Sequence, residues 1–144
     1  MATNPTYPVP AGTRVATRPE IASPSLQAFR ILRFAFTVAP IVAGLDKFFH
    51  LLVDWDKYLP PIVNAMLGGH GHVFMQAAGV IEIVAGIGIA LRPRLFSLVV
   101  CGWLLAIIAN LLMIPGYYDV ALRDLGLALG ALALNRLSLD HDGR

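Results

Sequence analysis

A few charged side chains stand inside otherwise apolar stretches of this chain. The segment GLDKFFHLL carries Asp46, Lys47 and His50, and Glu82 stands in the glycine-rich run GVIEIVAGIGIAL. A charged side chain at the centre of a bilayer costs about 2.5 to 3.5 kcal/mol on insertion scales, so such residues pair with one another or mark a functional site. Carboxyl groups can carry protons, and lysine or arginine can supply positive charge. Further candidates in the later apolar runs are Asn110, Arg123 and Asp124.

The composition of the chain indicates that lipid is its main solvent. Hydrophobic residues make up 57% of the 144 residues and charged residues 14%, and the mean hydropathy is +0.69. A soluble domain carries about 25% charged residues, so the apolar surplus predicts an integral membrane protein. The net charge of +2 is too small to indicate nucleic-acid binding. Cys101 is the single cysteine, which excludes an internal disulfide and a CxxC redox pair.

Four apolar segments are long enough to cross a bilayer as helices. About 20 residues span about 30 Å of hydrocarbon, and backbone in lipid must form its hydrogen bonds internally. Short turns join the last three segments, so neighbouring helices run antiparallel. The predicted fold is an all-α integral membrane protein, a four-transmembrane-helix bundle with up-down topology. The predicted spans cover about residues 31–53, 73–91, 95–114 and 120–139.

The membrane domain is predicted to lie between two tails. Residues 1–25 are rich in proline and lack the apolar core of a signal peptide, which predicts a flexible or partner-bound N-terminal tail. Ser23 and Pro24 fit the N-cap and the first position of the opening helix. The four-helix domain covers residues 26–140, and residues 141–144 form a C-terminal tail.

Basic residues are concentrated on one side of the predicted bundle. Only Lys47, Lys57 and Arg123 fall on the other side. Because cytoplasmic segments carry an excess of lysine and arginine, both termini are predicted to be cytoplasmic. The eight residues on the predicted cytoplasmic side are Arg14, Arg18, Arg30, Arg33, Arg92, Arg94, Arg136 and Arg144.

Helical spacing predicts which way the polar side chains point. Small residues mark the faces along which membrane helices pack, and Asp46 and His50 continue the stripe of Ala39 and Ala43 on the first helix. Lys47 falls to one side of that stripe, and it either extends to the interface or, like Arg123, is available as the cation that a buried Glu82 requires. Glu82 shares a face with two glycines close to mid-membrane. We therefore expect a polar pocket in the outer half of the bundle, with Glu82 as its floor.

Two of these assignments have a structural alternative. Glu82 either takes part in chemistry or only forms a hydrogen bond between helices. Arg123 either pairs across helices, with Glu82 or Asp46, or extends from its helix end toward water.

The histidines raise the question of a metal site. His50, His70 and His72, together with Asp54, contain ligand types that suit zinc, copper or iron. Nothing in their spacing fixes a ligand geometry, so the sequence assigns no metal site and leaves these residues as an alternative.

Three motifs in sequence order carry a family resemblance. They are AGLDKFFHLL at residues 43–52, GVIEIVAGIGIALRPR at residues 79–94 and LNRLSLD at residues 134–140. Together they resemble the DoxX-like family of small four-helix bacterial membrane proteins, over about residues 28–140. The resemblance implies a multi-pass protein of the bacterial cytoplasmic (inner) membrane with a link to redox chemistry. Members of the family include subunits of thiosulfate:quinone oxidoreductase.

The resemblance implies a small membrane subunit associated with a quinone-linked redox complex. The chain has no intrinsic cofactor motif, so at most it is an oxidoreductase subunit that needs partner subunits and takes quinone as its ligand. Under this hypothesis Glu82 and Asp46 are the catalytic, proton-carrying groups. The residues expected to bind the quinone head group are Lys47, His50, Asn110, Arg123 and Asp124.

Two other functions compete with this hypothesis. The first is a non-catalytic subunit that anchors or completes a larger membrane complex, built with other protein subunits or as a homo-oligomer; the proline-rich tail and the small size favour it. The second is a small-solute carrier. Four helices without an internal repeat or a broken helix give little material for alternating access, so this function ranks last.

Overall fold

The computed structural model describes residues 23–141, and residues 1–22 and 142–144 lie outside this description. The predicted N-terminal tail therefore falls almost entirely outside the described residues. Between residues 23 and 141 all regular structure is helical, with no strand. The elements are α1 (Pro24–Phe49), the 3-10 helix η1 (Trp55–Tyr58), α2 (Pro61–Met66), α3 (Gly71–Leu91), α4 (Pro93–Leu111) and α5 (Tyr118–His141).

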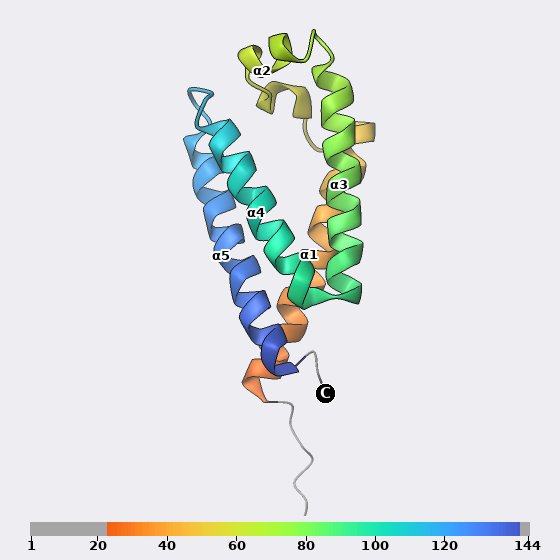
Figure 1. Cartoon of the computed structure of the whole chain (residues 1–144), viewed down its shortest axis with the longest axis vertical. Helices are drawn as coiled ribbons and strands as arrows, with labels where there is room; N and C mark the ends of the chain where they lie inside the picture. Colours follow the sequence, from red (N-terminus) through yellow and green to blue (C-terminus); the bar gives the residue numbers. More distant parts are fainter. Residues whose placement is uncertain (1–22, 142–144) are drawn as a thin grey trace, which may run out of the picture.

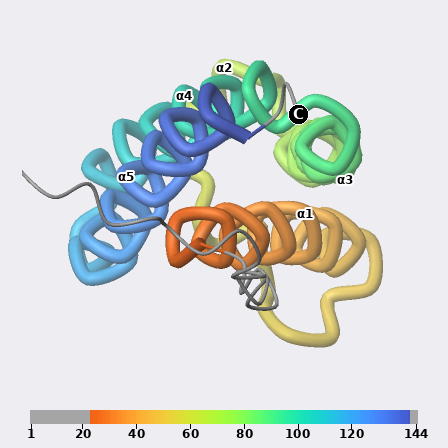
Figure 2. The backbone as a smooth tube through the Cα atoms, turned by 90° about the horizontal axis from the view of Figure 1, so that it is seen from below, coloured from red at the N-terminus to blue at the C-terminus, as the bar shows by residue number. Residues whose placement is uncertain are grey.

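The four long helices form two antiparallel pairs. Helix α1 packs along α3, and α4 packs along α5, while α1–α5 and α3–α4 contacts join the pairs less extensively. The pairs converge at the end where α1 begins and α5 finishes, and they diverge toward the end that carries η1 and α2 (Figure 1). Viewed along the bundle, α1 and α3 lie on one side and α4 and α5 on the other (Figure 2).

The first helix begins where the sequence predicts and ends earlier. The amide of Leu26 donates a hydrogen bond of 3.3 Å to the Ser23 hydroxyl, and Pro24 is the first helical residue, which confirms the predicted cap. The predicted end near residue 53 is wrong, because α1 stops at Phe49 and His50 adopts the left-handed conformation.

Glycines allow α1 and α3 to approach to backbone contact. A Cβ atom on Gly44 would lie 2.5 Å from the carbonyl oxygen of Gly79, and one on Gly79 would lie 2.6 Å from the carbonyl oxygen of Gly44. No other residue fits at either position without a shift of the helices. The predicted packing face of the second span, through Gly79, Glu82 and Gly86, is therefore confirmed, since all three residues are buried.

Much of the helix surface is apolar, as a lipid-facing surface must be. Phe34 is 71% exposed on α1, Val84 is 55% exposed on α3 and Leu105 is 50% exposed on α4. Helices α1, α3 and α4 are long and apolar enough to cross a membrane. Helix α5 covers the predicted fourth span, but Arg123 and Asp124 interrupt its apolar run and it is not among these three. The chain is thus a helical protein with membrane-type helices.

Candidate functional site

A buried ion pair joins the two most closely packed helices. The Nζ atom of Lys47 on α1 lies 2.6 Å from Oε2 of Glu82 on α3, and the two side chains are 5% and 10% exposed. Each residue stands three positions after the glycine at which the helices touch. A Cβ on Gly79 would lie 3.2 Å from the Cβ of Lys47. The glycine contact therefore brings lysine and carboxylate into direct reach of each other.

Two tryptophans complete this centre. The Nζ atom of Lys47 lies 3.8 Å from the ring centroid of Trp55, which is a cation–π distance. The indole nitrogen of Trp103 on α4 donates a hydrogen bond of 3.4 Å to Oε1 of Glu82. Because Trp103 belongs to α4, the centre connects the α1–α3 pair to the α4–α5 pair. We call Lys47, Trp55, Glu82 and Trp103 the polar centre.

Asp46 is buried beside the polar centre but faces the connection that follows α1. Its carboxylate accepts hydrogen bonds from the indole nitrogen of Trp55 at 2.7 Å and from the amide of Val53 at 3.3 Å. The amides of Leu51 and Leu52 each donate to it at 2.9 Å. These four donors turn the chain away from the helix axis at His50 and hold the Trp55 ring over Lys47. Asp46 therefore organises the end of α1.

The structure reverses the expected roles of the neighbouring charges on α1. Of the two alternatives for Lys47, the structure shows the pairing with Glu82, and the prediction that Asp46 faces Glu82 is wrong. The cause is the glycine contact. Gly44, three residues before Lys47, marks the closest approach to α3, whereas Ala39 on the expected stripe is exposed.

Arg123 lies outside the polar centre. Its guanidinium donates a hydrogen bond of 3.0 Å to Asp119, one turn earlier on α5, and the two side chains are 70% and 71% exposed. Of the two alternatives for Arg123, the structure shows extension toward water and not pairing with Glu82 or Asp46, because α5 has diverged from α1 and α3 at this end (Figure 1).

The remaining predicted binding residues occupy different places. Asn110 on α4 donates a hydrogen bond of 2.8 Å to the carbonyl oxygen of Tyr58, which ties the connection between α1 and α3 to α4. Asp124 is partly buried on α5, whereas its neighbour Arg123 is exposed, and it lies within electrostatic range of Lys47 and Glu82.

Two of the three candidate histidines meet at the C-terminal end of α1. The rings of His50 and His72 stack with centroids 5.5 Å apart and an interplanar angle of 18°. The Nδ1 atom of His72 lies 2.9 Å from a carboxylate oxygen of Asp56. His70 is not part of this group, since its Nδ1 atom lies 3.1 Å from the carbonyl oxygen of Leu67. The sequence prediction named two members of this cluster and missed Asp56.

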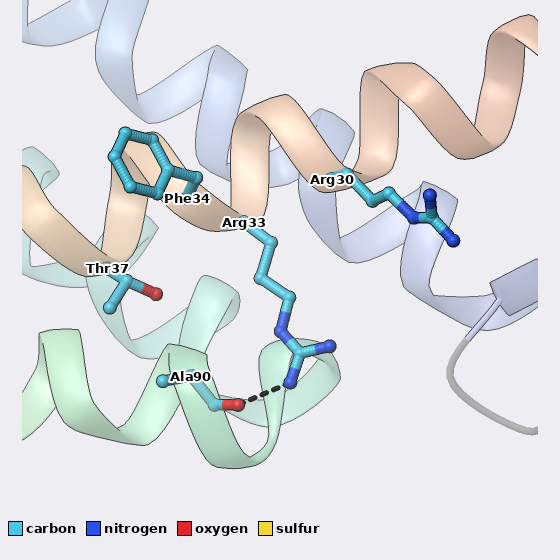
Figure 3. Close-up of a pocket in the computed structure, with 5 residues that line it drawn as sticks. All are labelled: Arg30, Arg33, Phe34, Thr37 and Ala90. Carbon is cyan, nitrogen blue, oxygen red and sulfur yellow. Dashed lines mark hydrogen bonds between the residues drawn. The ribbon is translucent and has the colours of Figure 1, made fainter.

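A hollow of about 300 Å³ lies at the opposite end of the bundle. In Figure 3 the side chain of Arg33 reaches from α1 to the last turn of α3, where it donates a hydrogen bond to the carbonyl oxygen of Ala90. Arg30 points away from this hydrogen bond, and the ring of Phe34 lies on the opposite side of Arg33 (Figure 3). The hollow is remote from the polar centre, which is enclosed between helices.

The tryptophans of the polar centre are the functional candidates that sequence reasoning missed. An indole N–H buried among helices requires an acceptor, and Glu82 is the acceptor for Trp103. A tryptophan inside an apolar span was therefore a signal of a polar partner nearby.

Comparison with known proteins adds no relative. No family model matches the chain, and no curated protein or solved structure matches it. The geometry of the polar centre and the motifs of the sequence carry the functional argument.

Proposed function

We propose that this chain is a small four-helix subunit of a quinone-linked redox complex in the bacterial cytoplasmic membrane, similar to the DoxX-like family. The observation that carries the proposal is the Lys47–Glu82 ion pair, buried between α1 and α3 with an indole donor from α4. A lysine and a glutamate that are both withdrawn from water inside apolar helices mark a functional site by default.

The proposal includes a fourth membrane span and cytoplasmic termini. Helix α5 has 24 residues and exposes large apolar side chains, including Leu122 at 70% and Leu129 at 61%. The start of α1, the α3–α4 junction and the end of α5 lie at one end of the bundle (Figure 1). Five arginines belong to these segments, and the positive-inside rule assigns that end to the cytoplasm. The polar centre then lies in the outer half of the membrane. The five are Arg30, Arg33, Arg92, Arg94 and Arg136.

The polar centre has the groups that quinone chemistry requires of a protein. Reduction of a quinone takes up two electrons and two protons, and the protons end on its two carbonyl oxygens. The Lys47 ammonium would donate a hydrogen bond to one quinone oxygen. The Glu82 carboxylate would take up a proton from water and pass it to that oxygen, and water would supply the second proton to the other oxygen. The flat indoles of Trp55 and Trp103 would contact the quinone ring. The electrons must come from a redox cofactor in a partner subunit.

The residues of the proposed site differ from the set that the sequence suggested. Asp124 stays in the site because it interacts electrostatically with Lys47 and Glu82. Arg123, Asn110 and His50 leave it, since their partners lie on the exposed start of α5, in the connection between α1 and α3, and in the first turn of α3, respectively.

A second function, that of a non-catalytic assembly subunit, is favoured by a different observation. No buried side-chain nitrogen or oxygen of the described residues lacks a hydrogen-bond partner, so the polar centre is stable as it stands. In addition, nothing lies within 4 Å of a Cβ placed on Gly102 of α4 or on Gly126 of α5. Faces of this kind suit close packing against a helix of another subunit.

The two functions are separated by Glu82→Gln in the assembled complex. Glutamine still accepts the Trp103 hydrogen bond, but it leaves the buried Lys47 without its anion and therefore costs stability. Partner recovery and quinone binding and turnover are therefore compared on the folded, monodisperse fraction of each sample. For a quinone-linked subunit, partner recovery in mild detergent stays normal while extractable quinone and quinone turnover fall. For an assembly subunit, partner recovery falls and the activity of each assembled complex is unchanged.

A matched control comes from the exposed ion pair on α5. Asp119→Asn removes a carboxylate at a similar distance from its cation but in water, and it should change neither quantity. If Glu82→Gln, like Asp119→Asn, changes neither partner recovery nor quinone binding and turnover, both the quinone-linked function and the assembly function are wrong.

A further inference from the structure

We propose that the outer end of the molecule holds a divalent transition-metal ion of the zinc type, bound by His50, Asp56 and His72. The site is separate from the polar centre and does not depend on the proposed redox function. Each of the three residues offers one ligand atom, and these atoms lie within 4.8 Å of one another. Two imidazole nitrogens and a carboxylate oxygen are a ligand set that zinc and similar ions take in proteins.

The spacing requires only a small adjustment to close around an ion. Zinc binds nitrogen and oxygen ligands at about 2.0 to 2.2 Å in tetrahedral geometry, so two ligands on one ion are separated by roughly 3.3 to 3.6 Å. The His72 and Asp56 side chains are 53% and 43% exposed, and they can rotate without displacing a core. The required movement is therefore within the reach of side-chain rotation.

The backbone at His50 supplies a second, independent observation. His50 is the only residue other than glycine with a positive φ between residues 23 and 141, at φ 51° and ψ 38°. This position, directly after the end of a helix, is one that glycine occupies at no steric cost and that costs other residues about 1 kcal/mol. Strain of this kind at a residue with a reactive side chain points to a use for that side chain.

Rigid elements hold all three ligands near their places. The carboxylate of Asp46 fixes the three amides that follow His50. Asp56 lies in η1, whose first turn is capped by Asp54 at 3.3 Å. His72 stands in the first turn of α3, where the amide of Gly71 donates a hydrogen bond of 3.0 Å to Asn64.

The side chain of Gln76 gives His72 the outer partner that metal-bound histidines usually have. Its amide nitrogen lies 3.3 Å from Nε2 of His72, while Nδ1 faces Asp56. An ion on Nδ1 leaves the ring proton on Nε2, so the Gln76 amide must turn by about 180° and accept from Nε2 with its oxygen. This partner would fix the orientation of the imidazole toward the ion. With three protein ligands, the ion keeps a coordination position for water or for a ligand from the outer side.

The test is a zinc titration of the full chain, purified in mild detergent with an affinity tag that contains no histidine and stripped with a chelator. We expect saturable binding of one Zn²⁺ ion per chain by calorimetry. Co²⁺ bound at the same place should give the visible absorption of a tetrahedral centre. Affinity should fall as the pH is lowered, since protons compete with the ion for its ligands.

Substitutions then identify the ligands. His50→Gly, Asp56→Asn and His72→Gln should each weaken Zn²⁺ binding by at least the 10- to 100-fold that loss of an outer-shell partner costs. His50→Gly is the most informative, because glycine suits the left-handed position. It should unfold at the same or a higher temperature than the unmodified chain while it loses zinc.

Two neighbouring residues provide the matched controls. His70→Gln removes a histidine two positions from His72, and Asp54→Asn removes a carboxylate two positions from Asp56 while keeping a helix cap. Both should bind Zn²⁺ as the unmodified chain does. The proposal is overturned if the chain shows no saturable binding, if His50→Gly binds zinc normally, or if His70→Gln lowers the affinity as much as His72→Gln.

Discussion

The two helix pairs of this molecule have the same topology and use glycine in opposite ways. In the α1–α3 pair, Gly44 and Gly79 bring the two backbones into contact. In the α4–α5 pair, Gly102 and Gly126 face open space and nothing lies within 4 Å of a Cβ at either position. All four glycines stand within apolar segments of the sequence, so the sequence alone does not distinguish them. Small residues therefore indicate close packing only where a second small residue lies opposite.

The charged residues follow the same division. The ion pair of the α1–α3 pair is 5% and 10% exposed, and it lies next to the glycine contact. The ion pair of α5, between Arg123 and Asp119, is about 70% exposed. Where backbones touch, neither lipid nor water can enter, and charges there must neutralise each other. Where the helices diverge, charges reach water and contribute little.

Replacing the lysine of the buried pair should cause the largest loss of stability. Lys47→Met leaves Glu82 without its cation inside the bundle, and such a loss costs about 3 to 5 kcal/mol of unfolding free energy. The measurement is a titration of the detergent-solubilised chain with a denaturing detergent. Arg123→Met removes a cation from an exposed pair and should leave the transition almost unchanged.

A double variant tests whether the loss comes from the orphaned charge. Lys47→Met with Glu82→Leu replaces the pair by apolar side chains, and this kind of exchange is often neutral or stabilising. Recovery of most of the lost stability is the expected result. If the double variant is as unstable as Lys47→Met alone, the stem of the lysine rather than its charge supports the α1–α3 contact.

The glycine contrast predicts effects of opposite sign. Gly79→Ala places a Cβ 2.6 Å from the carbonyl oxygen of Gly44, and overpacking of this kind costs about 1 to 3 kcal/mol. Gly126→Ala adds a methyl group to open space on a helix and should gain up to about 1 kcal/mol. Both values can be measured in the same detergent titration. Equal effects at the two positions would contradict the difference in packing.

The positions of the long helices were predictable because their signals are local. Apolar runs of about 20 residues located them, and the Ser23–Pro24 pair gave the start of α1. The end of α1 was not predictable in this way. It is set by the Asp46 carboxylate, which takes hydrogen bonds from the amides of residues 51 to 53. That arrangement exists only once the chain has turned.

The residues that form the polar centre were predictable in part. The sequence identified Glu82 as buried and gave Lys47 as one of its two available cations. The predicted packing face of α1 is wrong, because it follows the alanine stripe through Ala39 instead of Gly44. Alanine keeps helices a methyl group further apart than glycine does, so Gly44 marks the true contact. Trp103 reaches Glu82 from another helix, and no spacing within one segment contains that information.

The smallest effect is expected where the two helix pairs meet. Trp103→Phe removes the hydrogen bond to Glu82, which at 3.4 Å is near the upper limit for such a bond. The loss should be about 0.5 to 1.5 kcal/mol, well below that of Lys47→Met, because Lys47 still neutralises the carboxylate. The chain has two tryptophans, so the variant leaves Trp55 as the single indole fluorophore. Its emission should match that of a buried ring, since Asp46 still holds it over Lys47. A loss as large as that of Lys47→Met, or an emission shift toward that of exposed indole, would mean that the α1–α3 pair depends on α4 to keep its charges together.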